Sequence, residues 1–211
     1  MIIGQSVDHR PLVAHRVGDP AAVVRVLVVG DVHGNERAGE RIVARLRRMR
    51  TPRGVRLYLV RTANPDGVAA GIRQDARGVD LNRNFPWDWR PGPRGTYYPG
   101  PRAASEPETR ALMRLVRRER PDLAIYYHQH LRIVVRAPAA DGSLQRAYAR
   151  RTGLALRSLA RLPGTAVAWE NHVVHGGSAF VVELGPGRAD ARRHASAVLA
   201  LARTLRRRRA T

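Results

Sequence analysis

The sequence predicts an α/β protein in which helices cover a largely parallel sheet. Short apolar runs bounded by turn residues alternate with segments whose apolar residues recur at helical spacing. That alternation is typical of helices packed on a parallel sheet. The length of 211 residues suits one domain with a core large enough to need no disulfide. We therefore expect residues 1–211 to form a single domain.

The elements of the first half follow from these patterns. Two short strands around the turn "DHRP", a core strand, a helix and a second core strand are expected at 2–18, 24–30, 36–49 and 55–63. Residues 64–105 show no periodicity and are rich in glycine and proline, which predicts a long loop. A loop of that length inside a compact domain usually has a functional role.

The second half opens with a helix at 105–120, for which Ser105 and Glu108 have the spacing of a capping box. Strands are then expected at 123–130 and 132–138, a helix at 143–160, a last core strand at 179–185 and a closing helix at 189–208. The helix at 143–160 should break or kink near Gly153.

The chain is strongly basic, with a formal net charge of +21 and 38 basic residues. All of them are arginine, a bias that a GC-rich genome produces without selection for binding. Many lie in helical segments, where a solvated face is the usual explanation. We therefore expect no specific nucleic-acid partner, although a looser attraction to polyanions or an anionic cell wall fits this charge.

Further classes of protein are excluded by what the chain lacks. With no cysteine, it has neither disulfides nor thiolate metal sites, so any metal must be held by His, Asp or Glu. No apolar run reaches the ~18 residues of a transmembrane helix. The first twenty residues do not have the pattern of a signal peptide. The sequence as given predicts a cytoplasmic protein, or a secreted one if an export signal has been removed, and leaves the oligomeric state open.

Polar side chains follow three predicted core strands where each ends. His33 and Glu36 come after the first, His128 and His130 end the strand at 123–130, and Glu183 ends "AFVVE". Sites in open α/β sheets gather at the carboxyl ends of strands. Two imidazoles and one carboxylate leave a position open for water, which is typical of catalytic zinc. A buried Glu183 is costly unless it is paired or used, so the alternative for it is a salt bridge to an arginine.

Seven motifs then occur in a recognisable order. They are "HGNE" at 33–36, "NPDG" at 64–67, "GVDLNRNFPW" at 78–87, "YYPGP" at 97–101, "SEPET" at 105–109, the strand ending in His128, and "VVELG" at 181–185. Together they resemble the zinc metallocarboxypeptidase family, the carboxypeptidase A-like peptidases, and most of all its bacterial murein peptide amidase-like branch. The resemblance implies a three-layer α/β/α fold with a mixed, mostly parallel sheet.

The resemblance also implies a metal centre and a catalytic carboxylate. It makes His33, Glu36 and His128 the ligands of one Zn²⁺ per chain, with His130 as a rival for the third position. It makes Glu183 the catalytic acid/base.

Substrate contacts are implied in the same way. Asn82 and Arg83 match the pair that holds a substrate's terminal carboxylate. Arg73 matches the arginine that polarises the scissile carbonyl, with Arg77 as its competitor. The expected partner is therefore a short peptide with a free carboxylate.

The implied activity is zinc-dependent hydrolysis of a peptide or amide bond near that carboxylate, with the γ-D-glutamyl-diaminopimelate bond of murein peptides as the candidate. The alternative enzyme is an N-acyl amino-acid deacylase of the aspartoacylase and succinylglutamate desuccinylase type, which looks similar in HxxE, "DLNR" and a later His. The alternative without catalysis is a basic module that binds cell wall or nucleic acid.

One stretch departs from the family. Digestive members cover the substrate with a tyrosine from a mobile loop, and "GTAVAWENHVVHGGSAF" at 164–180 contains no tyrosine. The polar and aromatic residues found there instead are Trp169, Glu170, Asn171, His172 and His175.

Overall fold

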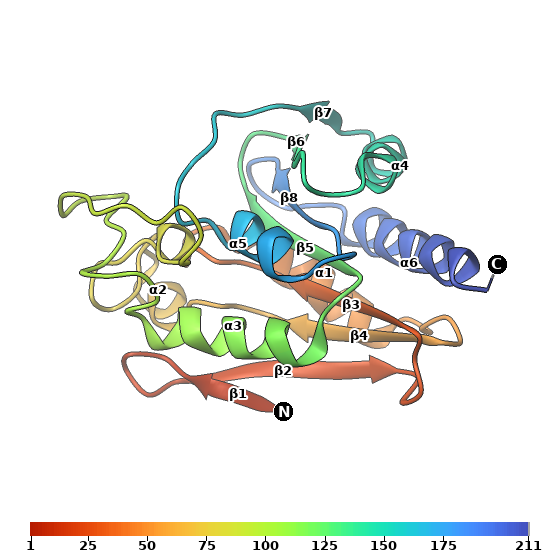
Figure 1. Ribbon diagram of the computed structural model, residues 1–211, viewed down its shortest axis with the longest axis horizontal. Coiled ribbons are helices and arrows are strands. Elements are labelled where there is room, and N and C mark those ends of the chain that lie inside the picture. The colour runs from red at the N-terminus through yellow and green to blue at the C-terminus, as the bar shows by residue number, and fades with distance from the viewer. Residues whose placement is uncertain (211) are drawn as a thin grey trace.

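The computed structural model describes residues 1–210, which form one eight-stranded mixed sheet with helices on both faces (Figure 1). The strand order is β1-β2-β4-β3-β5-β8-β6-β7. The strands are β1 (Ile2–Gln5), β2 (Pro11–Gly18), β3 (Val24–Val29), β4 (Val55–Val60), β5 (Leu123–Gln129), β6 (Ile133–Val135), β7 (Ala155–Arg157) and β8 (Ala179–Leu184). The helices are α1 (Ala38–Arg48), α2 (Pro65–Ala70), α3 (Pro107–Glu119), α4 (Gly142–Thr152), α5 (Ala166–Val173), α6 (Ala191–Arg208) and the 3₁₀ turn η1 (Leu81–Arg83).

The centre of the sheet is parallel and its margins are mixed. β4, β3, β5 and β8 run parallel to one another, whereas β1–β2, β2–β4 and β6–β8 are antiparallel pairs. The central strands read as continuous apolar runs because both of their faces are buried. The expected three-layer α/β/α architecture with a mostly parallel sheet is confirmed.

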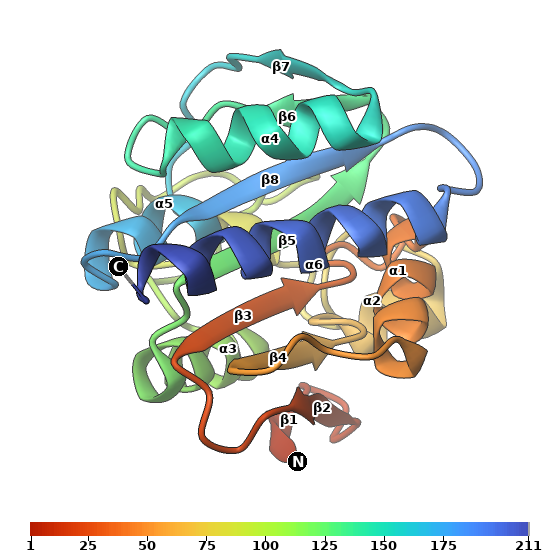
Figure 2. The ribbon, with the colours of Figure 1, turned by 90° about the vertical axis from the view of Figure 1, so that its right-hand side faces the viewer.

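Two hydrophobic cores lie on opposite faces of this sheet. One is built under α1, α4 and α6, and the other under α3 and α5. Figure 2 shows α4 and α6 lying across the face of the sheet turned to the viewer. No helix within residues 1–210 is long and apolar enough to cross a membrane. Helices therefore cover both faces of the central strands.

The predicted break near Gly153 is confirmed, but the helix expected at 143–160 does not resume after it. Gly153 ends α4 in a left-handed conformation (φ 74°) and donates its N–H to Ala149 O. The chain after it becomes β7, which pairs with β6. Gly153 adopts positive φ at no steric cost, so it ends the helix instead of bending it.

The predicted capping box at the start of α3 does not form. The N-cap residue is Glu106, and it makes no side-chain cap. The Ser105 hydroxyl instead accepts a hydrogen bond from Asn84 Nδ2 (2.8 Å), and Glu108 accepts one from the N–H of Val7 (2.9 Å). Partners from distant segments therefore outcompete the local cap.

Ordered structure also occurs where none was predicted. The loop at 64–105 contains α2 and η1, and the segment at 164–180 contains α5. These elements are only 6, 3 and 8 residues long, too short for a helical period to be visible in the sequence.

Candidate active site

The turn after β3 is shaped by close packing against α2. A Cβ atom on Gly34 would lie 1.9 Å from the carbonyl carbon of Gly67, so this approach requires glycine. α2 is capped by Asn64, whose Oδ1 accepts a hydrogen bond from the N–H of Gly67 (2.8 Å). The "NPDG" motif therefore combines a cap, a proline at the first turn and a glycine at the contact. This packing holds the turn that contains His33 and Glu36.

Three side chains from two strand ends converge beside that turn. Oε2 of Glu36 lies 3.0 Å from Nδ1 of His33 and 2.8 Å from Nδ1 of His128, and the two ring nitrogens lie 3.1 Å apart. All three residues are buried. Burial raises the pKa of Glu36, but its hydrogen bonds with His128 and His33 outweigh that effect and lower it. Glu36 is therefore a carboxylate, as a metal ligand must be.

The donor set and its surroundings fit a zinc ion. Two imidazoles and a carboxylate are the ligands of catalytic zinc sites with an open position. Nε2 of His33 lies 3.1 Å from Oδ1 of Asp80, and a carboxylate on the second ring nitrogen orients a ligating histidine. Burial raises the pKa of Asp80, but His33, Arg73 and Arg83 lower it to about 2.

Asp80 is a site residue that sequence reasoning missed. It also caps η1, because its Oδ1 accepts a hydrogen bond from the N–H of Asn82 (2.9 Å). The available signal was its position directly before "LNR". The rival ligand His130 is exposed, and within residues 1–210 it is not part of the converging group.

Glu183 lies opposite His128, because β5 and β8 pair in parallel with these two residues in register. It is half-buried, and burial is the main cause that raises the pKa of its carboxyl group. Among residues 1–210 no arginine lies within 4.0 Å of this carboxylate. Within the described residues, Glu183 therefore does not form the salt bridge to an arginine that was the alternative for it.

Arg73 lies against the converging group and Arg77 does not. Nη1 of Arg73 is 3.1 Å from Oε1 of Glu36, and Nη2 is 2.9 Å from Oδ2 of Asp80. Arg77 instead reaches Glu106 at 3.3 Å. Of the two competing arginines, only Arg73 has its guanidinium at the candidate metal centre.

Asn82 and Arg83 lie on η1, beside this group. Arg83 is 9% exposed, and burial lowers its pKa. Its Nη1 donates to the carbonyl of Asn82 (2.7 Å), and its guanidinium lies 5.6 Å from the ring centre of Tyr97. Within residues 1–210, Arg83 has no carboxylate partner within 4.0 Å. A buried cation without an ion pair is suited to receive an anionic group from a ligand.

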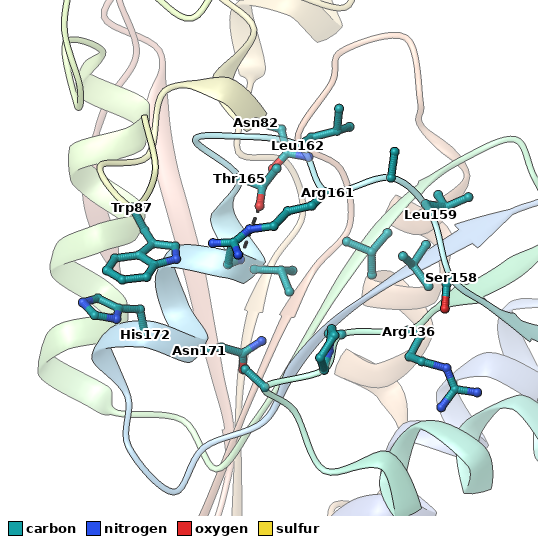
Figure 3. Close-up of a pocket in the computed structure, with 18 of the residues that line it drawn as sticks. Asn82, Trp87, Arg136, Ser158, Leu159, Arg161, Leu162, Thr165, Asn171 and His172 are labelled. Carbon is teal, nitrogen blue, oxygen red and sulfur yellow. Dashed lines mark hydrogen bonds between the residues drawn. The ribbon is translucent and has the colours of Figure 1, made fainter. Parts of the chain in front are cut away.

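A cavity of about 620 Å³ opens beside these residues (Figure 3). Its wall includes Asn82, His128 and Glu183, and its other side is formed by residues 135–139 and 158–162. One space is therefore lined by a predicted metal ligand, the predicted acid/base and a predicted substrate-binding amide.

The segment that lacks the family's tyrosine forms α5 at the edge of this cavity. Trp169 and Glu170 are buried and do not reach the cavity. Asn171 lines it, but its side chain also bonds both backbone groups of Ala179. His172 lines the cavity as well, and its ring stacks on Trp87 at a centroid distance of 3.4 Å.

An α/β sheet with two imidazoles and a carboxylate at the ends of its central strands is typical of a metalloenzyme. The sequence pattern of the zinc carboxypeptidase family matches residues 1–177, and the chain belongs to this family. The family is zinc-dependent, in agreement with the donor set found here. The matched stretch ends before Glu183.

Individual relatives agree with this assignment. Murein peptide amidase A of Escherichia coli K12 is 35% identical over 120 residues, covering 50% of this chain and 49% of that protein. Carboxypeptidase SOL1 of Arabidopsis thaliana is 30% identical over 131 residues, covering 54% of this chain and 26% of that protein. Each alignment thus spans about half or less of the curated relative.

Solved structures match over almost the whole chain. Murein-tripeptide amidase MpaA of Escherichia coli O157 superposes with a TM-score of 0.76 at 28% identity, covering 98% of this chain and 91% of that one. Carboxypeptidase A of Helicoverpa armigera gives 0.80 at 15% identity, covering 99% and 67%. The second likeness shows the shared fold.

Proposed function

We propose that this protein is a zinc-dependent metallocarboxypeptidase that hydrolyses a peptide or amide bond near a free carboxylate. The observation that carries the proposal is the single cavity that His128, Glu183 and Asn82 line together. His33, Glu36 and His128 would hold the zinc ion. Bound there, zinc would polarise the scissile carbonyl and lower the pKa of a coordinated water.

Glu183 acts in this proposal as general base and then as general acid. Its carboxylate takes a proton from the attacking water and delivers it to the nitrogen of the leaving amine. Burial makes the carboxylate more basic than an exposed one, which favours proton uptake. Lining the same cavity as His128, it is near the centre where the water would be activated.

Arg73 and the pair on η1 position the substrate. The Arg73 guanidinium would stabilise the negative charge that develops on the carbonyl oxygen. Arg83 and Asn82 would hold the free carboxylate, Arg83 by charge-assisted hydrogen bonds. Holding one end of the substrate this way selects the bond near that end and orients it for attack.

The best candidate for the substrate is a cell-wall peptide that carries diaminopimelate, cut at the γ-D-glutamyl bond. It is supported by the two relatives named as murein peptide and murein-tripeptide amidases. The net charge of +21 also favours anionic substrates.

The test measures bound zinc and then compares two peptides that differ only in a free or amidated terminal carboxylate. We expect about one zinc ion per chain. The amidated peptide should lose roughly ten- to hundred-fold in kcat/KM, because a charge-assisted hydrogen bond contributes about 1.5–3 kcal/mol. Arg83→Ala should remove most of that difference by weakening only the free acid. Equal cleavage of both peptides by the unmodified enzyme, or turnover restricted to N-acyl amino acids, would contradict the proposal.

A further inference from the structure

The cavity beside Glu183 is placed to receive a substrate side chain. Its wall begins at Asn82, next to Arg83, and continues past Glu183. If the free carboxylate of the terminal residue binds at Asn82 and Arg83, the side chain of that residue enters this cavity. The inference rests on the proposed function in this respect, and it concerns which terminal residue the enzyme prefers.

The wall combines apolar surface with positive charge. Leu159, Leu162 and Trp87 contribute apolar side chains that are between 37% and 47% exposed. Glu183 is the only acidic residue in the described wall, and the proposed reaction uses it for proton transfer. The basic side chains that line the wall besides His128 are Arg136, Arg161, His172 and His175.

The two arginines of the wall are oriented differently. Figure 3 shows the guanidinium of Arg161 pointing into the cavity between Trp87 and Asn171, whereas that of Arg136 points away from them. Nε of Arg161 forms a long ion pair with Oδ2 of Asp88, and their separation of 3.7 Å is beyond hydrogen-bond distance. The Arg161 side chain is 68% exposed. Its guanidinium therefore keeps donors available for a ligand inside the cavity.

We propose that Arg161 determines specificity by binding an anionic group on the side chain of the terminal residue. Preferred terminal residues would carry an acidic group at the end of an aliphatic stem. The apolar walls bury the stem, and the guanidinium of Arg161 donates hydrogen bonds to the carboxylate. Terminal residues whose side chain is cationic and carries no acidic group, such as lysine, would be disfavoured, because the only acidic group of the described wall is Glu183.

The test uses the zinc-loaded enzyme and one series of acyl-dipeptides with a free terminal carboxylate. Their terminal residues are glutamate, glutamine, norleucine and lysine. We expect kcat/KM for glutamate to exceed that for glutamine by at least about fivefold, the effect of a partly solvated ion pair worth about 1 kcal/mol. Lysine should be the poorest of the four. Raising the salt concentration should reduce the preference.

Variants distinguish the effect of Arg161 on specificity from the effect of the overall positive charge of the protein. Arg161→Gln should bring the glutamate-to-glutamine ratio close to one, and Arg161→Glu should shift the preference to lysine. Arg136→Gln removes an equal charge from the same wall, but its guanidinium points away, so it should keep the ratio of the unmodified enzyme.

The outcomes distinguish this inference from the proposed function. If no peptide of the series is cleaved, the proposed function fails. If all four are cleaved with equal kcat/KM, the carboxypeptidase proposal stands and the role of Arg161 is wrong. A glutamate preference that survives in Arg161→Gln, or disappears equally in Arg136→Gln, would also overturn the role of Arg161.

Discussion

His128 and Glu183 are 55 positions apart in sequence, and they meet because β5 and β8 are parallel neighbours in register. The same sheet places His128 beside the turn that contains His33 and Glu36. Oδ1 of Asp80 lies within hydrogen-bond distance of Nε2, the second ring nitrogen of His33. Each proposed role at this site therefore depends on a single side chain at a strand end or in a turn. Single substitutions can test each role.

The first prediction distinguishes His128, near the end of β5, from His130, which directly follows the strand. His128→Ala should abolish stoichiometric zinc binding, because it removes one of three converging donors. His130→Ala should leave zinc content unchanged, since that side chain is exposed and apart from the group. Metal analysis of the purified variants after dialysis measures both. The opposite pattern, with zinc lost only in His130→Ala, would reassign the third ligand.

The second prediction concerns proton transfer. Glu183→Gln keeps the size and shape of the side chain but cannot take up a proton. Its kcat should fall at least ~10²–10⁴-fold, the usual contribution of general acid–base catalysis. Zinc content and the unfolding midpoint should stay close to those of the unmodified enzyme. Near-normal turnover in this variant would remove the role assigned to Glu183.

At the scale of elements, buried carboxyl groups join the loop after α2 to the start of α3. Asp75, Glu106 and Glu108 each place one oxygen within 4.8 Å of the others, and all three are buried. Burial, reinforced by the neighbouring acids, raises the pKa of Asp75 to about 8 and that of Glu108 to about 7. These two groups therefore hold protons near neutral pH and allow the contact to form without repulsion.

The third prediction is that the contribution of Asp75 and Glu108 to stability decreases as the pH rises. The ordinary values are 3.8 for Asp75 and 4.5 for Glu108, so between these values and about 8 the folded state binds more protons than the unfolded state. The contribution of these two groups to the free energy of unfolding should therefore fall by more than about 1 kcal/mol between about pH 5 and 8. The buried His194, whose pKa burial lowers to about 4, acts in the opposite direction below about pH 6.5, so the comparison with a variant isolates the carboxyl groups. Urea unfolding at a series of pH values measures it.

Asp75→Asn is the matched control, because an amide supplies a donor without titrating. Its free energy of unfolding should depend less on pH over the same range than that of the unmodified protein. The buried Glu170, with a pKa raised to about 8 by burial, contributes in the same direction in both proteins and cancels in the comparison. Identical pH profiles for the two proteins would show that Asp75 is ionised in the folded state.

At the scale of the whole molecule, one sheet separates two hydrophobic cores. The donors of the candidate metal centre come from positions up to 95 residues apart, so they converge only in the folded chain. An ion bound there stabilises the folded state over the unfolded one. This predicts that residues 1–211 behave as a single cooperative unit whose stability depends on zinc.

The fourth prediction is a single thermal transition that moves with zinc. Free zinc at 100 times its dissociation constant should add about 2.7 kcal/mol. For a domain of this size that raises Tm by roughly 5–10 °C. Calorimetry of the zinc-free and zinc-loaded protein measures the shift, and His128→Ala should show none. Two separate transitions would contradict the single domain.

The sequence alone determined the class of fold, most of the strands and the residue types at their ends. These depend on local patterns: apolar runs, helical spacing, and glycine or proline at turns. It also indicated His33 and Glu36, because a ligand pair three residues apart is visible in one short stretch. The absence of cysteine restricted any metal site to His, Asp and Glu.

Only the tertiary structure decided the contacts between distant segments. It placed the carboxylate of Asp80 at the second ring nitrogen of His33, and it replaced the capping box of Ser105 by a hydrogen bond from Asn84. It also buried Arg83 with no carboxylate partner among residues 1–210. It also placed the guanidinium of Arg161 in the cavity beside Glu183. The physical reason is that hydrogen bonds and burial depend on which groups come together in space. The pairing of strands and the packing of loops determine that proximity, and neither produces a periodic pattern of residues in the sequence.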